Sequence, residues 1–284
     1  MAVIIAVANE KGGVGKTTTA VNLAAGLSLK LAETEGSKGR ILLVDMDPQG
    51  HALMAIAYGH STLTSSESLA SLLIENPPPS IQKMVKQSQY HSNLFYIPSN
   101  RSSMITASRI LPTLMANETR LSLALRPIID QFGFIIIDTP PNMGDLLINS
   151  LVAANYILIP VETSYLGVAG LIELQRTIDQ VKMHFRPDIQ IMGYLPTLVE
   201  DLRSEVQDIL TQMQERYPNQ VLPPIHKSTD LAYAHSSHMD VFTYRPPRQR
   251  KPGQIYSSSR PTQEYSLLVD HVLSVAANYP IAKE

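Results

Sequence analysis

Cysteine is absent from this chain of 284 residues. The sequence therefore offers no disulfide framework, no thiolate metal site and no ligand set for an iron–sulfur cluster. It also has no apolar run long enough to cross a bilayer, and its first residues lack the basic region of a signal peptide. These absences predict a soluble cytoplasmic protein.

Net charge is also low, and a value of −2 does not by itself suggest a nucleic-acid-binding protein. The distribution of charge is more informative than its total. A proline-rich segment at about 244–260 contains no acidic residue, and its prolines favour an extended path. Its basic residues are Arg245, Arg248, Arg250, Lys251 and Arg260. Two interpretations are open, an arm that contacts DNA phosphates or a solvated loop.

The glycine-rich segment 9–18 contains two lysines where a standard phosphate loop contains one. The ordinary pattern is G-x-x-x-x-G-K-[ST], and Glu10 occupies the position of its first glycine. Lys16 is placed to reach the phosphates of its own nucleotide. Lys11 lies on the other side of the loop, and its side chain is expected to point away from that site. A lysine there predicts a second subunit that presents another nucleotide across an interface.

The surroundings of this loop are those that a nucleotide site needs. A continuous apolar run at 3–7 predicts a buried strand, and a helical pattern opens at Thr18. The glycines allow backbone N–H groups to surround phosphate oxygens at the helix N-terminus. The Thr17 hydroxyl is placed to coordinate Mg²⁺.

Three carboxylates follow two further apolar runs. Asp45 and Asp47 end the run at 41–44, and their alternation predicts that both side chains point to the same side. One could hold the metal shell while the other orients the attacking water. Asp138 ends the run at 134–137, which is the Walker B arrangement, and Thr139-Pro140-Pro141 then predicts a stiff, non-helical segment.

Strand and helix signals alternate along the whole sequence. Buried strands are expected near 2–8, 40–45, 93–98, 133–138, 155–160 and 190–195. This alternation predicts an α/β fold, with a mostly parallel twisted sheet covered by helices on both faces. We expect residues 1–284 to form a single P-loop ATPase domain. An apolar helical face at 265–276 predicts a C-terminal helix that docks on the sheet.

The motifs resemble those of the ParA family of deviant Walker ATPases, in the wider group that includes MinD and the nitrogenase iron protein. The matching segments are N-E-K-G-G-V-G-K-T-T (9–18), V-N-L-A (21–24), D-M-D-P-Q-G (45–50) and I-I-D-T-P-P (136–141). Weaker similarity extends over nearly the whole chain. The absence of cysteine excludes the nitrogenase iron protein itself.

The resemblance implies ATP and Mg²⁺ as cofactors and a role for each matching residue. Lys11 resembles the signature lysine that contacts the partner subunit's phosphates, and Lys16 resembles the Walker lysine. Asp47 matches the aspartate that positions water. The expected nucleotide contacts are Lys11, Gly12, Gly13, Val14, Gly15, Lys16, Thr17, Thr18 and, in a region that lines the adenine pocket of relatives, Thr197. The expected metal-site residues are Thr17, Asp45 and Asp138.

The resemblance also implies an ATP-dependent homodimer that binds DNA without sequence preference and associates with the nucleoid. An adaptor of the ParB or McdB type would stimulate hydrolysis. Arg203 and Lys227 fall in regions where relatives place basic residues that contact DNA. We expect no N-terminal operator-reading domain, because the first strand is expected to start at residue 2.

Two other functions share the same fold. A MinD-like protein would bind a membrane through a basic C-terminal helix. This chain ends instead with one base and one acid after Tyr279-Pro280, so we expect no membrane binding. A small-molecule kinase or synthetase would need an acceptor pocket, which the sequence does not reveal. The cargo, whether a plasmid, a chromosome or a protein organelle such as a carboxysome, is not written in the sequence.

Overall fold

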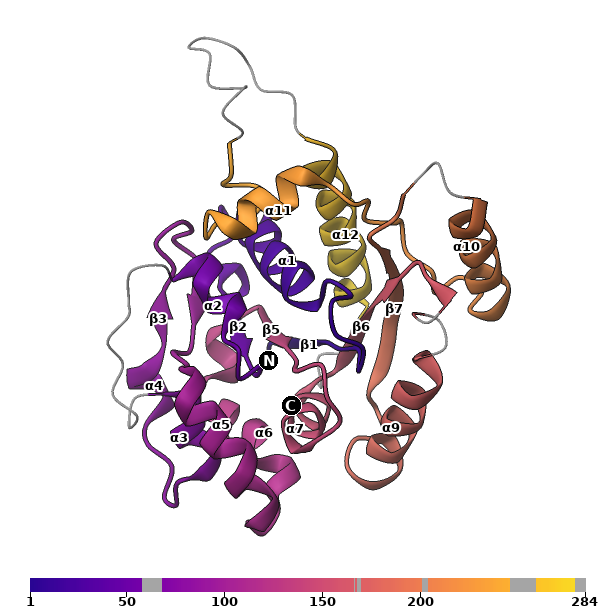
Figure 1. Cartoon of the computed structure of the whole chain (residues 1–284). Coiled ribbons are helices and arrows are strands. Elements are labelled where there is room, and N and C mark those ends of the chain that lie inside the picture. Colours follow the sequence, from indigo (N-terminus) through magenta and orange to yellow (C-terminus); the bar gives the residue numbers. More distant parts are fainter. Residues whose placement is uncertain (58–67, 166, 168–169, 201–203, 246–258, 279–284) are drawn as a thin grey trace.

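The computed structural model describes residues 1–57, 68–165, 167, 170–200, 204–245 and 259–278. Within these ranges a seven-stranded sheet has the order β3-β4-β2-β5-β1-β6-β7 (Figure 1). All neighbouring strands pair in parallel except β3, which is antiparallel to β4 at one edge. The strands are β1 Val3–Val7, β2 Ile41–Asp45, β3 Lys86–Gln87, β4 Leu94–Tyr96, β5 Phe134–Asp138, β6 Tyr156–Glu162 and β7 Gln190–Thr197.

Helices cover both faces of this sheet, as the alternating pattern predicts. One face carries α1 Lys16–Lys30, α2 His51–Ile56 and α12 Arg260–Ala277. The opposite face carries α3 Leu69–Ile74, α4 Ile81–Met84, α5 Arg101–Ile110, α6 Arg120–Leu125, α7 Asp145–Ala153, α9 Leu171–His184 and α10 Ser204–Arg216. Helix α11, Thr229–Ser236, lies beside α1 (Figure 1).

Two hydrophobic clusters form because side chains alternate along each strand. In β1, Ile4 and Ala6 belong to one cluster, whereas Ile5 and Val7 belong to the other. Both faces of the strand are therefore buried, which explains why the predicted strands are continuous apolar runs. The exposed pair Lys86–Gln87 has no such pattern, so β3 is not among the predicted strands.

The C-terminal helix, α12, packs on the face of the sheet that also carries α1. Its most extensive contacts are with α1, and its buried side chains join a hydrophobic cluster that also contains side chains of β1, β6 and β7 (Figure 1). Its side chains Tyr265, Leu268 and Val269 are buried there. Gly26 of α1 permits the close approach, because a Cβ at this position would lie 2.6 Å from Val269 Cγ2.

Parallel pairing brings the ends of the central strands together at one edge of the sheet. Asp45 is in register with Asp138, and Asp138 is in register with Val7, the last residue of β1. The loops that follow β1, β2 and β5 therefore converge, and ligands of open parallel sheets bind at this edge. No helix in the described ranges is long and apolar enough to span a bilayer.

Candidate functional site

The glycine-rich loop adopts a conformation in which two of its glycines are required. Gly13 and Gly15 have φ angles of +77° and +83°, a region that residues with a Cβ rarely adopt. Helix α1 begins directly after the loop at Lys16, two residues earlier than the helical pattern indicated. The helix N-terminus and the loop amides are therefore adjacent, which suits them to bind an anion.

Neighbouring strands hold the loop in place at both of its ends. Asn9 donates from Nδ2 to the Pro160 carbonyl at 2.7 Å, and its Oδ1 accepts from the Lys11 amide at 3.0 Å. Thr197 is the last residue of β7 and is 3% exposed. Its hydroxyl donates to the Val14 carbonyl at 2.9 Å. The structure thus gives Thr197 a contact under the phosphate loop, while its expected contact with adenine remains a prediction.

Lys16 is directed into the loop that precedes it. Its Nζ donates to the Lys11 carbonyl at 2.8 Å, and the residue is only 6% exposed. Burial lowers the pKa of the Lys16 ammonium, while the carboxylates of Asp138 and Asp47 act in the opposite direction. These two carboxylates are therefore close enough to Lys16 to favour its charged form.

Asp138 is fully buried, and neither of its carboxylate oxygens accepts a hydrogen bond of ordinary geometry, although the Thr17 hydroxyl lies near enough to act on it as a donor. Burial, together with the nearby Asp45, raises its pKa well above the usual value, whereas Thr17 and Lys16 oppose the rise. A buried carboxylate without partners is costly unless a cation or a bound water compensates it. Asp138 and the neighbouring Thr17 hydroxyl therefore fit a Mg²⁺ ion or its water ligands.

The two carboxylates of the D-x-D segment, Asp45 and Asp47, have different environments. Asp45 is fully buried and accepts from the amides of Asp47, Ala52 and Leu53 at 3.1, 3.0 and 3.3 Å. Burial raises its pKa to about 7, although these hydrogen bonds act against the rise. Its oxygens thus fasten the loop to the start of α2, whereas the partly exposed Asp47 accepts one amide, that of Gln49. Metal contact by Asp45 remains a prediction.

The Lys11 side chain lies against the end of β6. Its Nζ is 2.5 Å from Glu162 Oε2 and 3.3 Å from Ser164 Oγ. The sequence did not single out either partner, because each lies about 150 positions away and no local pattern joins them. Knowledge of the strand pairing would have been needed to find them.

Another contact that the sequence did not predict links the glycine-rich loop to α9 and to the segment after β5. The Thr177 hydroxyl lies 3.0 Å from Glu10 Oε1 and 3.1 Å from Met143 Sδ. Burial raises the pKa of Glu10, while the hydrogen bond from Thr177 acts against the rise. The residue that replaces the first glycine therefore anchors the loop to a helix.

Protein side chains alone do not form a metal site here. Within the part of the chain that the structure describes, no group of three or more His, Asp or Glu side chains is arranged to hold a metal ion. Mg²⁺ commonly binds through one or two protein oxygens together with substrate phosphates. Thr17 and Asp138, as two candidate protein ligands, suit that arrangement.

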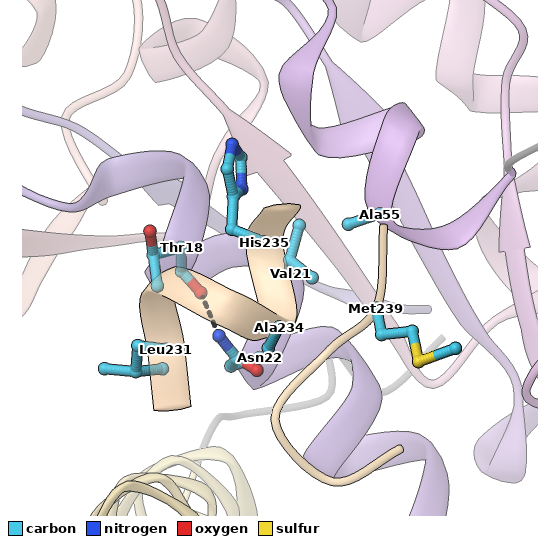
Figure 2. A pocket seen from close by; sticks show the side chains of 8 residues that line it. All are labelled: Thr18, Val21, Asn22, Ala55, Leu231, Ala234, His235 and Met239. Atoms are coloured by element: carbon cyan, nitrogen blue, oxygen red, sulfur yellow. Dashed lines mark hydrogen bonds between the residues drawn. The ribbon is translucent and has the colours of Figure 1, made fainter. Parts of the chain in front are cut away.

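A small cavity lies behind the first turn of α1, between α2 and α11. Figure 2 shows that Thr18 and Asn22 of α1, His235 of α11 and Met239 are among the residues that line it. Its volume is about 10 Å³, on the scale of a single water molecule. It is therefore too small to be the acceptor pocket that a small-molecule kinase or synthetase needs.

Two residues that are expected to contact DNA, Lys227 and Arg245, lie in the described part of the chain. Both side chains interact with other groups of the protein. Lys227 pairs with Glu200 at 2.9 Å, and 67% of its side chain is exposed. Arg245 donates from Nη1 to the carbonyls of Phe242 and Tyr244 at 2.6 and 3.0 Å. The remaining expected contacts, which lie outside the described residues, are Arg203, Arg248, Arg250 and Lys251.

Comparison with known proteins agrees with this site. The model of an AAA domain, AAA_31, matches residues 2–191. The chromosome partitioning protein ParA of Myxococcus xanthus is 34% identical over 78% of this chain and 74% of its own length.

Solved structures show the same fold. Apo McdA from Cyanothece has a TM-score of 0.76 at 25% identity and covers 94% of this chain and all of its own. A cobyrinic acid a,c-diamide synthase from Mycobacterium smegmatis, solved with an ATP analogue and magnesium, has a TM-score of 0.76 at 26% identity, covering 98% and 97%. The chain belongs to the AAA_31 family, in its ParA-like group of deviant Walker ATPases.

Proposed function

We propose that this protein is an ATPase of the ParA type that forms an ATP-dependent sandwich dimer, binds DNA without sequence preference and positions a cargo. The observation that carries the proposal is the combination of an intact phosphate loop with a second lysine, Lys11, whose ammonium group is held at the end of β6 by Glu162 and Ser164. An adaptor of the ParB or McdB type would stimulate hydrolysis. The 34% identity to a chromosome partitioning protein supports this function over that of a synthetase.

The nucleotide is ATP, and the metal is Mg²⁺. The amides around Gly13 and Gly15 suit the phosphates, and Lys16 would exchange the Lys11 carbonyl for phosphate oxygens. Thr17 and Asp138 would hold the ion, Thr17 directly and the buried carboxylate through water. Bound there, the ion would neutralise charge that develops on the phosphate oxygens.

Hydrolysis needs a residue that orients water, and Asp47 is the better candidate of the D-x-D pair. The Asp45 carboxylate is occupied by three backbone amides, whereas Asp47 is partly exposed and acts on the Lys16 charge. An Asp at this position can accept a proton from water or orient it for attack. The basal rate should be low, because a partner would complete the site.

Dimerisation is the test of this proposal. Lys11→Ala should remain monomeric with the non-hydrolysable analogue AMPPNP while it still binds the nucleotide. Each charge-assisted contact is worth about 1.5–3 kcal/mol, so losing two per dimer should weaken it about 10²-fold or more. Sedimentation velocity measures the dimer, and nucleotide titration by fluorescence measures binding.

Lys83→Ala is the matched control, because Lys83 is an exposed lysine of α4 on the opposite side of the sheet from α1. It should dimerise like the wild type. Equal dimer populations for Lys11→Ala and the wild type, or for the wild type with and without AMPPNP, would contradict the proposal.

A further inference from the structure

We infer that Glu162, assisted by Ser164, is a positioning residue that restrains Lys11 in the nucleotide-free monomer, so that both subunits must break this contact before they dimerise. The inference rests on the proposed ATP-dependent dimer and adds a specific restraint to it. We call the three side chains Lys11, Glu162 and Ser164 the lysine clasp.

The clasp presents two acceptors to one ammonium group. Glu162 Oε2 lies 2.5 Å from Lys11 Nζ, and Ser164 Oγ lies 3.3 Å from the same nitrogen. The charged side chains are only 30% and 33% exposed. The pair is thus screened less than one on the open surface, yet it remains open enough for a competing anion to approach.

A tight turn after β6 fixes the acceptor side of the clasp. The Ser164 amide donates to the Glu162 carbonyl at 2.8 Å, and the Gly167 amide donates to the Ser164 carbonyl at 2.9 Å and to its Oγ at 3.1 Å. A Cβ on Gly167 would lie 2.1 Å from the Glu162 carbonyl oxygen, so only glycine fits this turn. The two acceptors are therefore held together before Lys11 arrives.

The loop side is fixed as well, and it joins the clasp to the nucleotide site. Asn9 bridges the Lys11 amide and β6, while the Lys11 carbonyl accepts from Lys16 Nζ at 2.8 Å. Lys11 is therefore held at two points: Glu162 and Ser164 bind its side chain, and Lys16 binds its carbonyl. A nucleotide whose phosphates bind Lys16 would take this lysine from the Lys11 carbonyl, and only the side-chain contacts of Lys11 would then remain.

A clasp of this strength weakens the dimer without preventing dimerisation. The single carboxylate of Glu162 competes with a triphosphate that carries several negative charges. Lys11 would therefore bind the phosphates of the nucleotide held by a second subunit. Partly exposed ion pairs typically shift an equilibrium by up to about fivefold. Because a symmetric dimer breaks two clasps, the dimer dissociation constant is raised by up to about 25-fold.

Glu162→Gln tests the inference, because it removes the charge and keeps the size. With saturating AMPPNP, its dimer dissociation constant should fall about 5- to 25-fold below that of the wild type. Without nucleotide it should remain monomeric. Ser164→Ala, which removes only the weaker acceptor, should shift the constant in the same direction by less. Glu162→Asp retains the charge and should stay closer to the wild type than Glu162→Gln.

Asp270→Asn is the matched control. It makes the same change of charge and breaks an ion pair of 2.9 Å with Lys30, far from the loop. It should leave the dimer constant unchanged. Sedimentation equilibrium gives the constant, thermal melting checks that each variant is folded, and titration of the monomer with fluorescent ADP checks that nucleotide affinity is unchanged.

Measuring Lys11→Ala in the same series distinguishes failure of the clasp from failure of the proposed function. If Lys11→Ala stays monomeric but folded Glu162→Gln dimerises as the wild type does or more weakly, the clasp is only a structural ion pair and the inference fails alone. If Glu162→Gln fails to fold, the Ser164→Ala shift decides: no tightening overturns the inference. If Lys11→Ala dimerises normally, the proposed function itself fails.

Discussion

Asp45 and Asp138 stand opposite one another in the register of β2 and β5, and both are fully buried. Their surroundings nevertheless differ, since three amides bind the Asp45 carboxylate while neither carboxylate oxygen of Asp138 accepts a hydrogen bond of ordinary geometry. A satisfied buried carboxylate is a structural group, whereas an unsatisfied one is paired elsewhere or awaits a ligand. Asp47, two residues after Asp45, is therefore the carboxylate for which we propose the role of positioning water.

The first prediction concerns Asp47. Asp47→Ala should bind ATP and dimerise, but it should hydrolyse ATP on the order of 10²-fold or more slowly, because a residue that orients or deprotonates water contributes about that much. The dimer should therefore persist longer after ATP is added. Phosphate release measures hydrolysis, and light scattering over time measures dimer lifetime. A wild-type rate in this variant would assign water positioning to another residue.

The second prediction concerns the buried pair of Asp240 and His91. Asp240 is fully buried, lies 2.9 Å from His91 Nε2 and accepts from the Thr243 hydroxyl at 2.8 Å. Burial alone would raise the pKa of Asp240, but the bonds from His91 and Thr243 outweigh it and lower the pKa below 3.8. The native state therefore binds a proton less readily than the unfolded chain at this group.

The stability that Asp240 provides is thus fully present above about pH 4 and is lost as the pH falls through its lowered folded pKa. Asp240→Asn should cost about 2 kcal/mol at pH 7, because it leaves buried partners imperfectly paired. Its penalty should shrink in acid. Urea unfolding at pH 7 and near pH 3 measures both values. An equal penalty at the two pH values would show that the charge of Asp240 does not matter.

At the scale of elements, burial on both faces explains what could be predicted. Strands β1, β2 and β5 are continuous apolar runs between turn signals, so their positions follow from the sequence. The two-residue strand β3 is exposed and pairs only at an edge, so no periodicity marks it. The contact of α12 with α1 has no local sequence signal either, because an apolar face shows that a helix is buried but not which element covers it.

The third prediction concerns the contact between α1 and α12. Gly26→Ala would gain about 1 kcal/mol in helix propensity. The new Cβ, however, would lie 2.6 Å from Val269 Cγ2 and 3.0 Å from the Phe242 ring. Overpacking typically costs about 1–3 kcal/mol, so a net loss of about 1 kcal/mol in unfolding free energy is expected.

Val269→Ala supplies the control for this prediction, because it removes the methyl group nearest the added Cβ. In that background Gly26→Ala should cost less, by about 1 kcal/mol, or should stabilise the protein. Urea unfolding of the four variants gives the coupling energy. An additive result would show that α12 moves freely away from α1.

At the scale of the whole molecule, the site combines segments that are far apart in the sequence. The motifs identify Lys11, Lys16 and Asp138 because each lies at the end of an apolar strand or in the glycine-rich segment that follows one. Glu162, Ser164 and Thr197 contact the same loop only because β6 and β7 extend the sheet beside β1. Sequence therefore predicts residues with their own local pattern, and it misses those that tertiary pairing brings to the loop.

The last prediction concerns DNA and needs two copies of the chain. A few phosphate contacts per subunit bind weakly, and a dimer doubles them on one DNA molecule. Binding should therefore require ATP, should differ little between unrelated duplexes, and should weaken steeply with salt. Lys227 contributes only if phosphate displaces Glu200, its partner at 2.9 Å.

Replacing Arg245, Arg248, Arg250 and Lys251 with alanine should weaken binding to all duplexes alike and leave dimerisation intact. Four contacts per subunit make eight per dimer, so the slope of log affinity against log salt should become shallower by up to about 7. Fluorescence anisotropy on two unrelated duplexes at several salt concentrations measures this slope. Lys38→Ala together with Lys86→Ala controls for loss of positive charge elsewhere. An unchanged affinity and slope in the quadruple variant would make the basic segment a solvated loop and would shift DNA contact to Lys227 and Arg203.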